Sequence, residues 1–283
     1  MTDVRSHTWD LSDQEKVEKY FRPSCLPVLN NQPTKPPFSF DPYYGKTLSE
    51  IVIPSWLMAA PKDTIRNYFY ILQEAANFTG EKSGGCGTVG MASLPYPIAY
   101  QFLTTSYQNR LPFQSYVQTF QDIGHINLIK LNKVPADQTQ PDIARYFIEI
   151  ETIEGSTKKL TYFAYYYGFI YIKKEGSLYK IDDIEIHGED FLCAAYHGWH
   201  HNAEAVVDIE YGGWCKLVKR RYPTQQEGYI KYIYFLGTDG NDYCFIFFQL
   251  TNGTDILIAQ YKKTRNSKWE LIEIDPKKCL KEK

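Results

Sequence analysis

The sequence predicts an α+β fold, in which three N-terminal helices pack on a curved antiparallel sheet and are followed by a further helix and a C-terminal antiparallel β-meander. Three observations support this prediction. Apolar residues first recur at helical spacing, and from His125 onward they alternate as in strands. Aromatic residues make up 16% of the 283-residue chain, mainly as 24 Tyr and 16 Phe, which suits strands and half-buried faces. Tight-turn sequences separate the C-terminal apolar runs.

The first 60 residues are expected to form an extended arm because prolines recur there too often for regular structure. A capping-box pattern at Ser12 and Glu15 predicts one short helix, which Pro23 ends. Aromatic residues between Phe38 and Trp56 give the arm apolar anchors that a flexible linker lacks. The arm is therefore expected to wrap the body of the protein.

Three helices are predicted after the arm. The first begins at Asp63, because Ile65, Tyr68, Phe69 and Leu72 recur on one helical face. The other two are expected to open at prolines, which suit the first helical turn: Pro95 with Pro97, and Pro112. The glycine-rich stretch GEKSGGCGTVG separates the first two helices and is interpreted as a connecting loop, since it lacks the ending of a phosphate-binding loop.

Four successive strands are predicted next: HINLIKLNKV, ARYFIEIETI, KLTYFAYYYGFIYIKK and SLYKIDDIEI. Gly168 interrupts the longest run and indicates a bulge or a bend. From Gly228, four further strands are separated by TDGN, TNGT and TRNS, in which Asp239-Gly240 and Asn252-Gly253 supply the positive φ of tight turns. Four short strands are marginal alone, so this meander should pack on the first body or continue its sheet.

The helical segment PYPIAYQFLTTSYQNRLPFQSYVQTFQDI and the strands from His125 to His187 together resemble the nuclear-transport-factor-2-like (cystatin-like cone) superfamily, as a bacterial member. The resemblance covers residues 63–187 and concerns pattern alone. It implies a concave sheet face closed by helices, which such proteins use for small ligands, for dimerisation or for acid/base catalysis. It assigns no catalytic residue, because the superfamily has no universal catalytic signature.

The predicted organisation has four parts: a Pro-rich arm over 1–60, a cone-shaped helix-plus-sheet domain over 61–187, a helical junction over 188–227 and a four-strand meander over 228–283. The 31 basic and 33 acidic residues nearly balance, which disfavours binding to nucleic acid or to an anionic membrane. We find no transmembrane segment and no signal peptide, which predicts a cytoplasmic protein, or an extracytoplasmic one if a leader or an anchor has been lost. Six cysteines without a CxxC pattern predict reduced thiols.

The segment from His187 to Cys215 has the highest density of cysteine, histidine and tryptophan side chains in the chain. A helix capped by Asp190 would place four metal-ligating side chains on one stripe, Cys193, His197, His200 and His201, a set that Zn²⁺ accepts. Alternatively, Cys193 with His197, or Cys86 with a distant histidine, could act as a nucleophile pair. Gly198 weakens such a helix, so a structural His/Trp surface without a cofactor is the favoured interpretation.

Strand alternation supplies the candidate ligand pocket. In KIDDIEIHG, Asp183, Glu185 and His187 share one face with Ile181, either solvated or looking into a cavity, and Tyr165 and Tyr167 lie on the tyrosine-dense strand before it. The sequence contains no complete triad, phosphate loop or spaced metal motif. It therefore favours a non-catalytic binding or regulatory module for a small ligand or a protein partner. The alternatives are a metal-binding or Cys/His-dependent enzyme centred on residues 187–215, and a homo-oligomeric structural component such as a homodimer.

Overall fold

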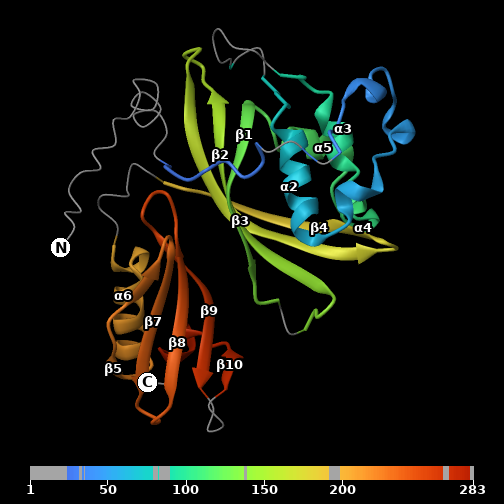
Figure 1. Ribbon diagram of the computed structural model, residues 1–283. Coiled ribbons are helices and arrows are strands. Elements are labelled where there is room, and N and C mark those ends of the chain that lie inside the picture. Colours follow the sequence, from blue (N-terminus) through green and yellow to red (C-terminus); the bar gives the residue numbers. More distant parts are fainter. Residues whose placement is uncertain are drawn as a thin grey trace, which may run out of the picture.

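A computed structural model of the protein describes residues 24–31, 34, 36–78, 82, 90–136, 139–190, 198–263 and 268–280. Two antiparallel sheets dominate the described residues, one of four strands and one of six. Figure 1 shows the short N-terminal helices gathered on one side of the four-stranded sheet, with the C-terminal sheet beside its other side. We call these two surfaces of the four-stranded sheet the helix-side face and the outer face.

The four-stranded sheet is a meander in which each strand pairs with the next, in the order β1-β2-β3-β4. Its strands are β1 (Ile123–Val134), β2 (Ile143–Gly155), β3 (Thr161–Glu175) and β4 (Leu178–Gly188). Gly168 stays in register between Ile148 and Ile186, and a Cβ there would lie 1.7 Å from the Glu185 carbonyl oxygen. The glycine is therefore required by a close backbone approach within the sheet, and no bulge occurs at it.

Short helices cover the helix-side face. Their bounds are η1 (Asp41–Tyr43), η2 (Leu48–Glu50), η3 (Ser55–Met58), α2 (Pro61–Leu72), α3 (Pro95–Tyr100), α4 (Thr105–Arg110) and α5 (Phe113–Gln118). The predicted apolar stripe of α2 is confirmed, because Ile65, Tyr68, Phe69 and Leu72 are all buried. The predicted second helix is interrupted where the Thr104 hydroxyl accepts a hydrogen bond from the backbone of Tyr107 and starts α4 as a separate helix.

The six-stranded sheet has the order β10-β9-β8-β7-β5, with β6 also paired to β7. Its elements are β5 (Val218–Arg221), β6 (Gln225–Glu227), β7 (Ile230–Gly237), β8 (Asp242–Gln249), β9 (Asp255–Lys263) and β10 (Trp269–Ile272). One face packs against α6 (Ala203–Val206) and the π-helical segment η6 (Val207–Trp214), where Tyr211 contacts Phe245. On the other face, Phe248 contacts Phe147 on the outer face of the first sheet, which joins the two sheets.

The described residues of the arm between Ser24 and Ala60 pack on the body, as Phe40, Tyr43 and Ile51 belong to the main core. Asn30 is buried and its side-chain nitrogen donates to the Phe69 and Ile126 carbonyls. The capping-box helix predicted at residues 12–23 lies outside the described residues.

The predicted fold class is wrong. The described chain is mostly β, with two antiparallel sheets of four and six strands, and its helices are short pieces distributed along the sequence in place of the three predicted N-terminal helices. The expected four-strand meander is also extended, because β5 and β6 before Gly228 join the same sheet. Helical spacing reports which face of a segment is apolar, whereas local capping decides how long each helix runs.

Reduced thiols are a wrong prediction for two of the cysteines, because Cys215 and Cys279 form a disulfide across a sequence separation of 64 residues. It links the end of η6 to the C-terminal helix α7 (Pro276–Cys279). Cys244 is buried, and its burial raises the pKa of the thiol to about 11. Cys25 is exposed. Within the described residues, no helix has the length and apolar character to span a membrane.

Candidate functional site

A cavity of about 430 Å³ lies between the short helices and the helix-side face of the four-stranded sheet. We call it the helix-side cavity. Its volume and its apolar, aromatic lining with a few convergent polar groups are typical of small-molecule sites. The described lining residues are Tyr68, Tyr107, Leu111, Tyr116, Thr119, Phe120, Gln121, Ile123, Ile150, Thr152, Glu154, Tyr166, Ile184 and Ile186.

Strand alternation builds the floor of the cavity. On β2, Ile150, Thr152 and Glu154 point to the helix side at every second position. On β4, a register shift opposite Tyr171 and Ile172 makes Asp182 an extra residue. Ile184 and Ile186 consequently face the cavity, while the Asp182 carboxylate accepts a hydrogen bond of 2.7 Å from the Thr104 hydroxyl.

Tyrosines from the helices form the walls. The Tyr116 hydroxyl donates to the Tyr68 hydroxyl at 3.1 Å, which fixes α5 against α2. Burial raises the pKa of Tyr107 to about 12, and it raises the pKa values of Tyr68 and Tyr116 further. These phenols are therefore neutral near pH 7 and offer aromatic faces and hydroxyl groups to a ligand.

Glu154 is the polar centre of the cavity and is buried, with 9% of its surface exposed. Its carboxylate accepts hydrogen bonds from the hydroxyls of Tyr166 at 2.6 Å, Thr152 at 2.8 Å and Tyr162 at 3.0 Å. Burial, and then the hydrogen bond to Glu154, raises the pKa of Tyr166. Three neutral donors thus hold one carboxylate in place at the cavity floor.

The pocket residues predicted from sequence lie on the outer face. Asp183 and Glu185 line a separate hollow of about 490 Å³ together with Arg110 and Arg145. Arg110 lies 3.5 Å from the Asp183 carboxylate, and the Arg145 guanidinium lies 3.6 Å from the Phe169 ring centroid. The hollow is therefore lined by both basic and acidic side chains, and Arg110 and Asp183 already form an ion pair in it.

The other three predicted pocket residues also avoid the helix-side cavity. The His187 and Tyr167 ring centroids are 5.5 Å apart on the outer face. Tyr165 is buried, and its hydroxyl donates to Glu151 at 2.6 Å. Ile181 was predicted to share a face with Asp183, Glu185 and His187. This is wrong, because the extra residue Asp182 turns Ile181 into the main core.

The metal candidates are only partly described. Cys193 and His197 lie in 191–197, outside the described residues. The single helix predicted through this block is wrong in its described part, because the backbone is extended at Gly198 and Asn202 on either side of the 3-10 helix η5 (Trp199–His201). The His200 and His201 ring centroids lie 4.1 Å apart. Among the described residues, no group of three or more His, Cys, Asp or Glu side chains could hold a metal ion.

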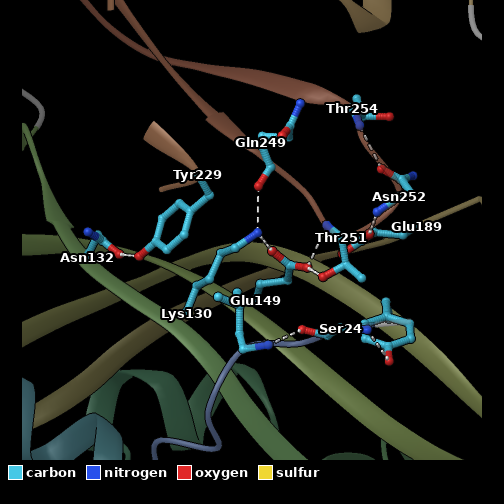
Figure 2. Close-up of polar contacts among 12 residues, drawn as sticks. Ser24, Lys130, Asn132, Glu149, Glu189, Tyr229, Gln249, Thr251, Asn252 and Thr254 are labelled. Atoms are coloured by element: carbon cyan, nitrogen blue, oxygen red, sulfur yellow. Dashed lines mark hydrogen bonds and ion pairs between the residues drawn. The ribbon is translucent and has the colours of Figure 1, made fainter. Parts of the chain in front are cut away.

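A second buried polar cluster joins the two sheets (Figure 2). Lys130 of β1 and Glu149 of β2 form an ion pair whose side chains are 2% and 0% exposed. Lys130 also donates to the Gln249 carbonyl at 2.5 Å, and the Thr251 backbone N–H donates to Glu149 at 2.9 Å. Glu189, which follows β4, accepts from the Asn252 backbone at 3.2 Å. The cluster therefore connects the outer face of the first sheet to the β8–β9 turn.

Glu189 in this buried polar cluster should make the stability of the protein depend on pH. Burial, together with the neighbouring Glu149 carboxylate, raises the pKa of Glu189 from 4.5 to about 9. Between these values the folded protein holds a proton that the unfolded chain releases, so the free energy of unfolding falls as pH rises. The contribution is at most about 1.4 kcal/mol per pH unit.

Glu189→Gln should flatten this slope in urea titrations between about pH 5 and pH 9. The exposed Glu185→Gln is the matched control and should leave the slope unchanged. Equal slopes in the wild-type protein and Glu189→Gln would contradict the assignment.

Sequence reasoning missed the residues of the helix-side cavity. A signal was present in β2, where Ile148, Ile150, Thr152 and Glu154 alternate with Glu149 and Glu151, so that an apolar face ends in one carboxylate. Alternation groups such residues without saying which face the helices cover. Comparisons of the chain with protein-family models, curated proteins and solved structures found no match. The resemblance to the nuclear-transport-factor-2-like superfamily therefore stays a prediction.

Proposed function

We propose that the protein is a non-catalytic binding module that holds a small organic ligand in the helix-side cavity. The observation that carries this proposal is the cavity itself: about 430 Å³, aromatic walls from α2, α4 and α5, and one hydrogen-bonded carboxylate at the floor. Apolar surface supplies affinity and a few placed polar groups supply orientation, which is the usual division of roles in such sites.

A cavity-blocking variant tests the proposal. Ile186 lines the cavity and is 40% exposed, so Ile186→Trp should fill the space without disturbing the core. Val52→Trp is the matched control, because Val52 is 81% exposed and lies outside the cavity. Binding of a fragment library with neutral, cationic and anionic members is measured by ligand-observed NMR.

We expect fragments to bind the wild-type protein and Val52→Trp, and to lose binding in Ile186→Trp. Equal binding to all three proteins would place the fragments elsewhere and overturn the proposal. Failure of every fragment to bind the wild-type protein would overturn it as well.

We also propose that the protein works in an oxidising compartment. The Cys215–Cys279 disulfide supports this, since reducing cytosol rarely maintains structural disulfides. Alkylation of thiols in intact cells before lysis tests it: Cys215 and Cys279 should be protected from alkylation, and their full labelling would contradict the proposal.

A further inference from the structure

We infer that the ligand of the helix-side cavity is an organic cation, with an ammonium group beside Glu154 and an apolar body between the tyrosine walls. This inference rests on the proposed function and adds the chemical class of the ligand. Its basis is the charge and the surface chemistry of the cavity.

The first argument is charge. Among the described residues that line the cavity, Glu154 alone carries a formal charge. Its described hydrogen-bond donors are the neutral hydroxyls of Tyr166, Thr152 and Tyr162, and no described cation lies within 4.0 Å of it. A buried carboxylate without a counter-ion is costly, and hydrogen bonds offset only part of that cost. The cavity therefore has a negative potential that a bound cation would neutralise.

Lys82 is a described cation that interacts electrostatically with Glu154. Its ammonium lies 3.0 Å from the Asp122 carboxylate, and its side chain is 44% exposed. The hydrogen bond to Asp122 is the main cause that raises the pKa of Lys82, ahead of the weaker attraction of Glu154. Lys82 therefore forms its ion pair with Asp122 and not with Glu154.

The second argument is the aromatic lining of the cavity. Tyr107, Tyr116, Phe120 and Tyr166 surround the space with aromatic rings. The faces of such rings attract ammonium groups, and the attraction is stronger where water is excluded. An anionic ligand would meet the Glu154 carboxylate with a like charge, and a neutral ligand would leave that carboxylate without a counter-ion. A cation satisfies both the ring faces and the carboxylate.

Two probes of equal shape test the inference on the full-length protein. Choline and 3,3-dimethylbutan-1-ol differ in one atom, a quaternary nitrogen in place of a carbon, so they differ in charge and hardly in size. Their dissociation constants are measured by NMR titration. We expect choline to bind about 10- to 100-fold more tightly, as a unit charge a few ångströms from a buried carboxylate should.

Glu154→Gln keeps the side-chain size and an oxygen acceptor. It should weaken the binding of choline about tenfold or more, and it should leave the dissociation constant of 3,3-dimethylbutan-1-ol unchanged. Glu185→Gln, on the outer face, is the control for a lost negative charge and should change neither constant. Because the comparison of the two probes on the wild-type protein needs no variant, poor folding of Glu154→Gln would leave the test intact.

Three results would overturn the inference: equal binding of the two probes, tighter binding of the alcohol, or binding of neither. If neutral fragments still bind in a manner that Ile186→Trp abolishes, the cavity remains a ligand site and only its preference for a cation fails. If Ile186→Trp abolishes nothing, the proposed function fails first.

Discussion

Lys130→Met is expected to lower the free energy of unfolding by about 3 to 5 kcal/mol, the usual cost of leaving one buried charge without its partner. Lys130 and Glu149 are almost completely buried. The Lys130 ammonium also contacts the Gln249 carbonyl and lies 4.7 Å from the Tyr229 ring centroid. Loss of the Lys130 ammonium leaves the Glu149 carboxylate buried between the two sheets, beside Glu189. Urea denaturation followed by circular dichroism measures the effect.

A double variant separates charge from packing. Lys130→Met with Glu149→Met removes both charges and should recover at least half of the lost stability, because two apolar side chains can replace a buried ion pair. Lys180→Met is the matched control, since Lys180 pairs with Glu175 at 3.0 Å at a more exposed place. Its expected cost is about 1 kcal/mol or less. If Lys130→Met lowered the free energy of unfolding by no more than Lys180→Met does, the stabilising role assigned to the buried Lys130–Glu149 ion pair would be contradicted.

Removal of the Cys215–Cys279 disulfide is expected to have the second large effect on stability. Cys215→Ser with Cys279→Ser should lower the free energy of unfolding by up to about 4 kcal/mol, because the bond closes a loop of 64 residues in the unfolded chain. The loop contains all six strands of the six-stranded sheet, so that sheet should become the less stable part of the protein.

Thiol counting in denaturant checks the bond directly. Of the six cysteines, at most four should react before reduction, and Cys215 and Cys279 should be protected. Reaction of all six in unreduced protein would show that the bond does not form. Denaturation of the double variant, with and without reductant, then gives the stability; reductant should affect the wild-type protein alone.

Elements with strong local signals were predictable from sequence. The apolar stripe of α2 and the alternation of β1 to β4 identified those elements and several of their buried positions. The turns at Gly240 and Gly253 were also predictable, since both adopt positive φ. In each case the residues that decide the structure are neighbours in sequence.

The rest depends on contacts between distant residues. The extra residue Asp182 reverses the face of Ile181, and its carboxylate contacts Thr104, 78 positions earlier. The disulfide joins two cysteines with no recognisable spacing. Glu154 gains its place in the cavity only because α5 and α4 cover the face on which it lies. Local patterns do not reveal an extra residue within a strand, and they do not specify what packs against each face.

The most direct test of the helix-side cavity as the ligand site is a crystal soaked with tetramethylarsonium, a quaternary cation whose arsenic atom scatters anomalously. We predict an anomalous peak inside the cavity, between the Glu154 carboxylate and the rings of Tyr107, Tyr116 and Tyr166. The same soak of an Ile186→Trp crystal should show no peak at that position. A wild-type crystal with an empty cavity, or with arsenic bound only at other places, would contradict the account.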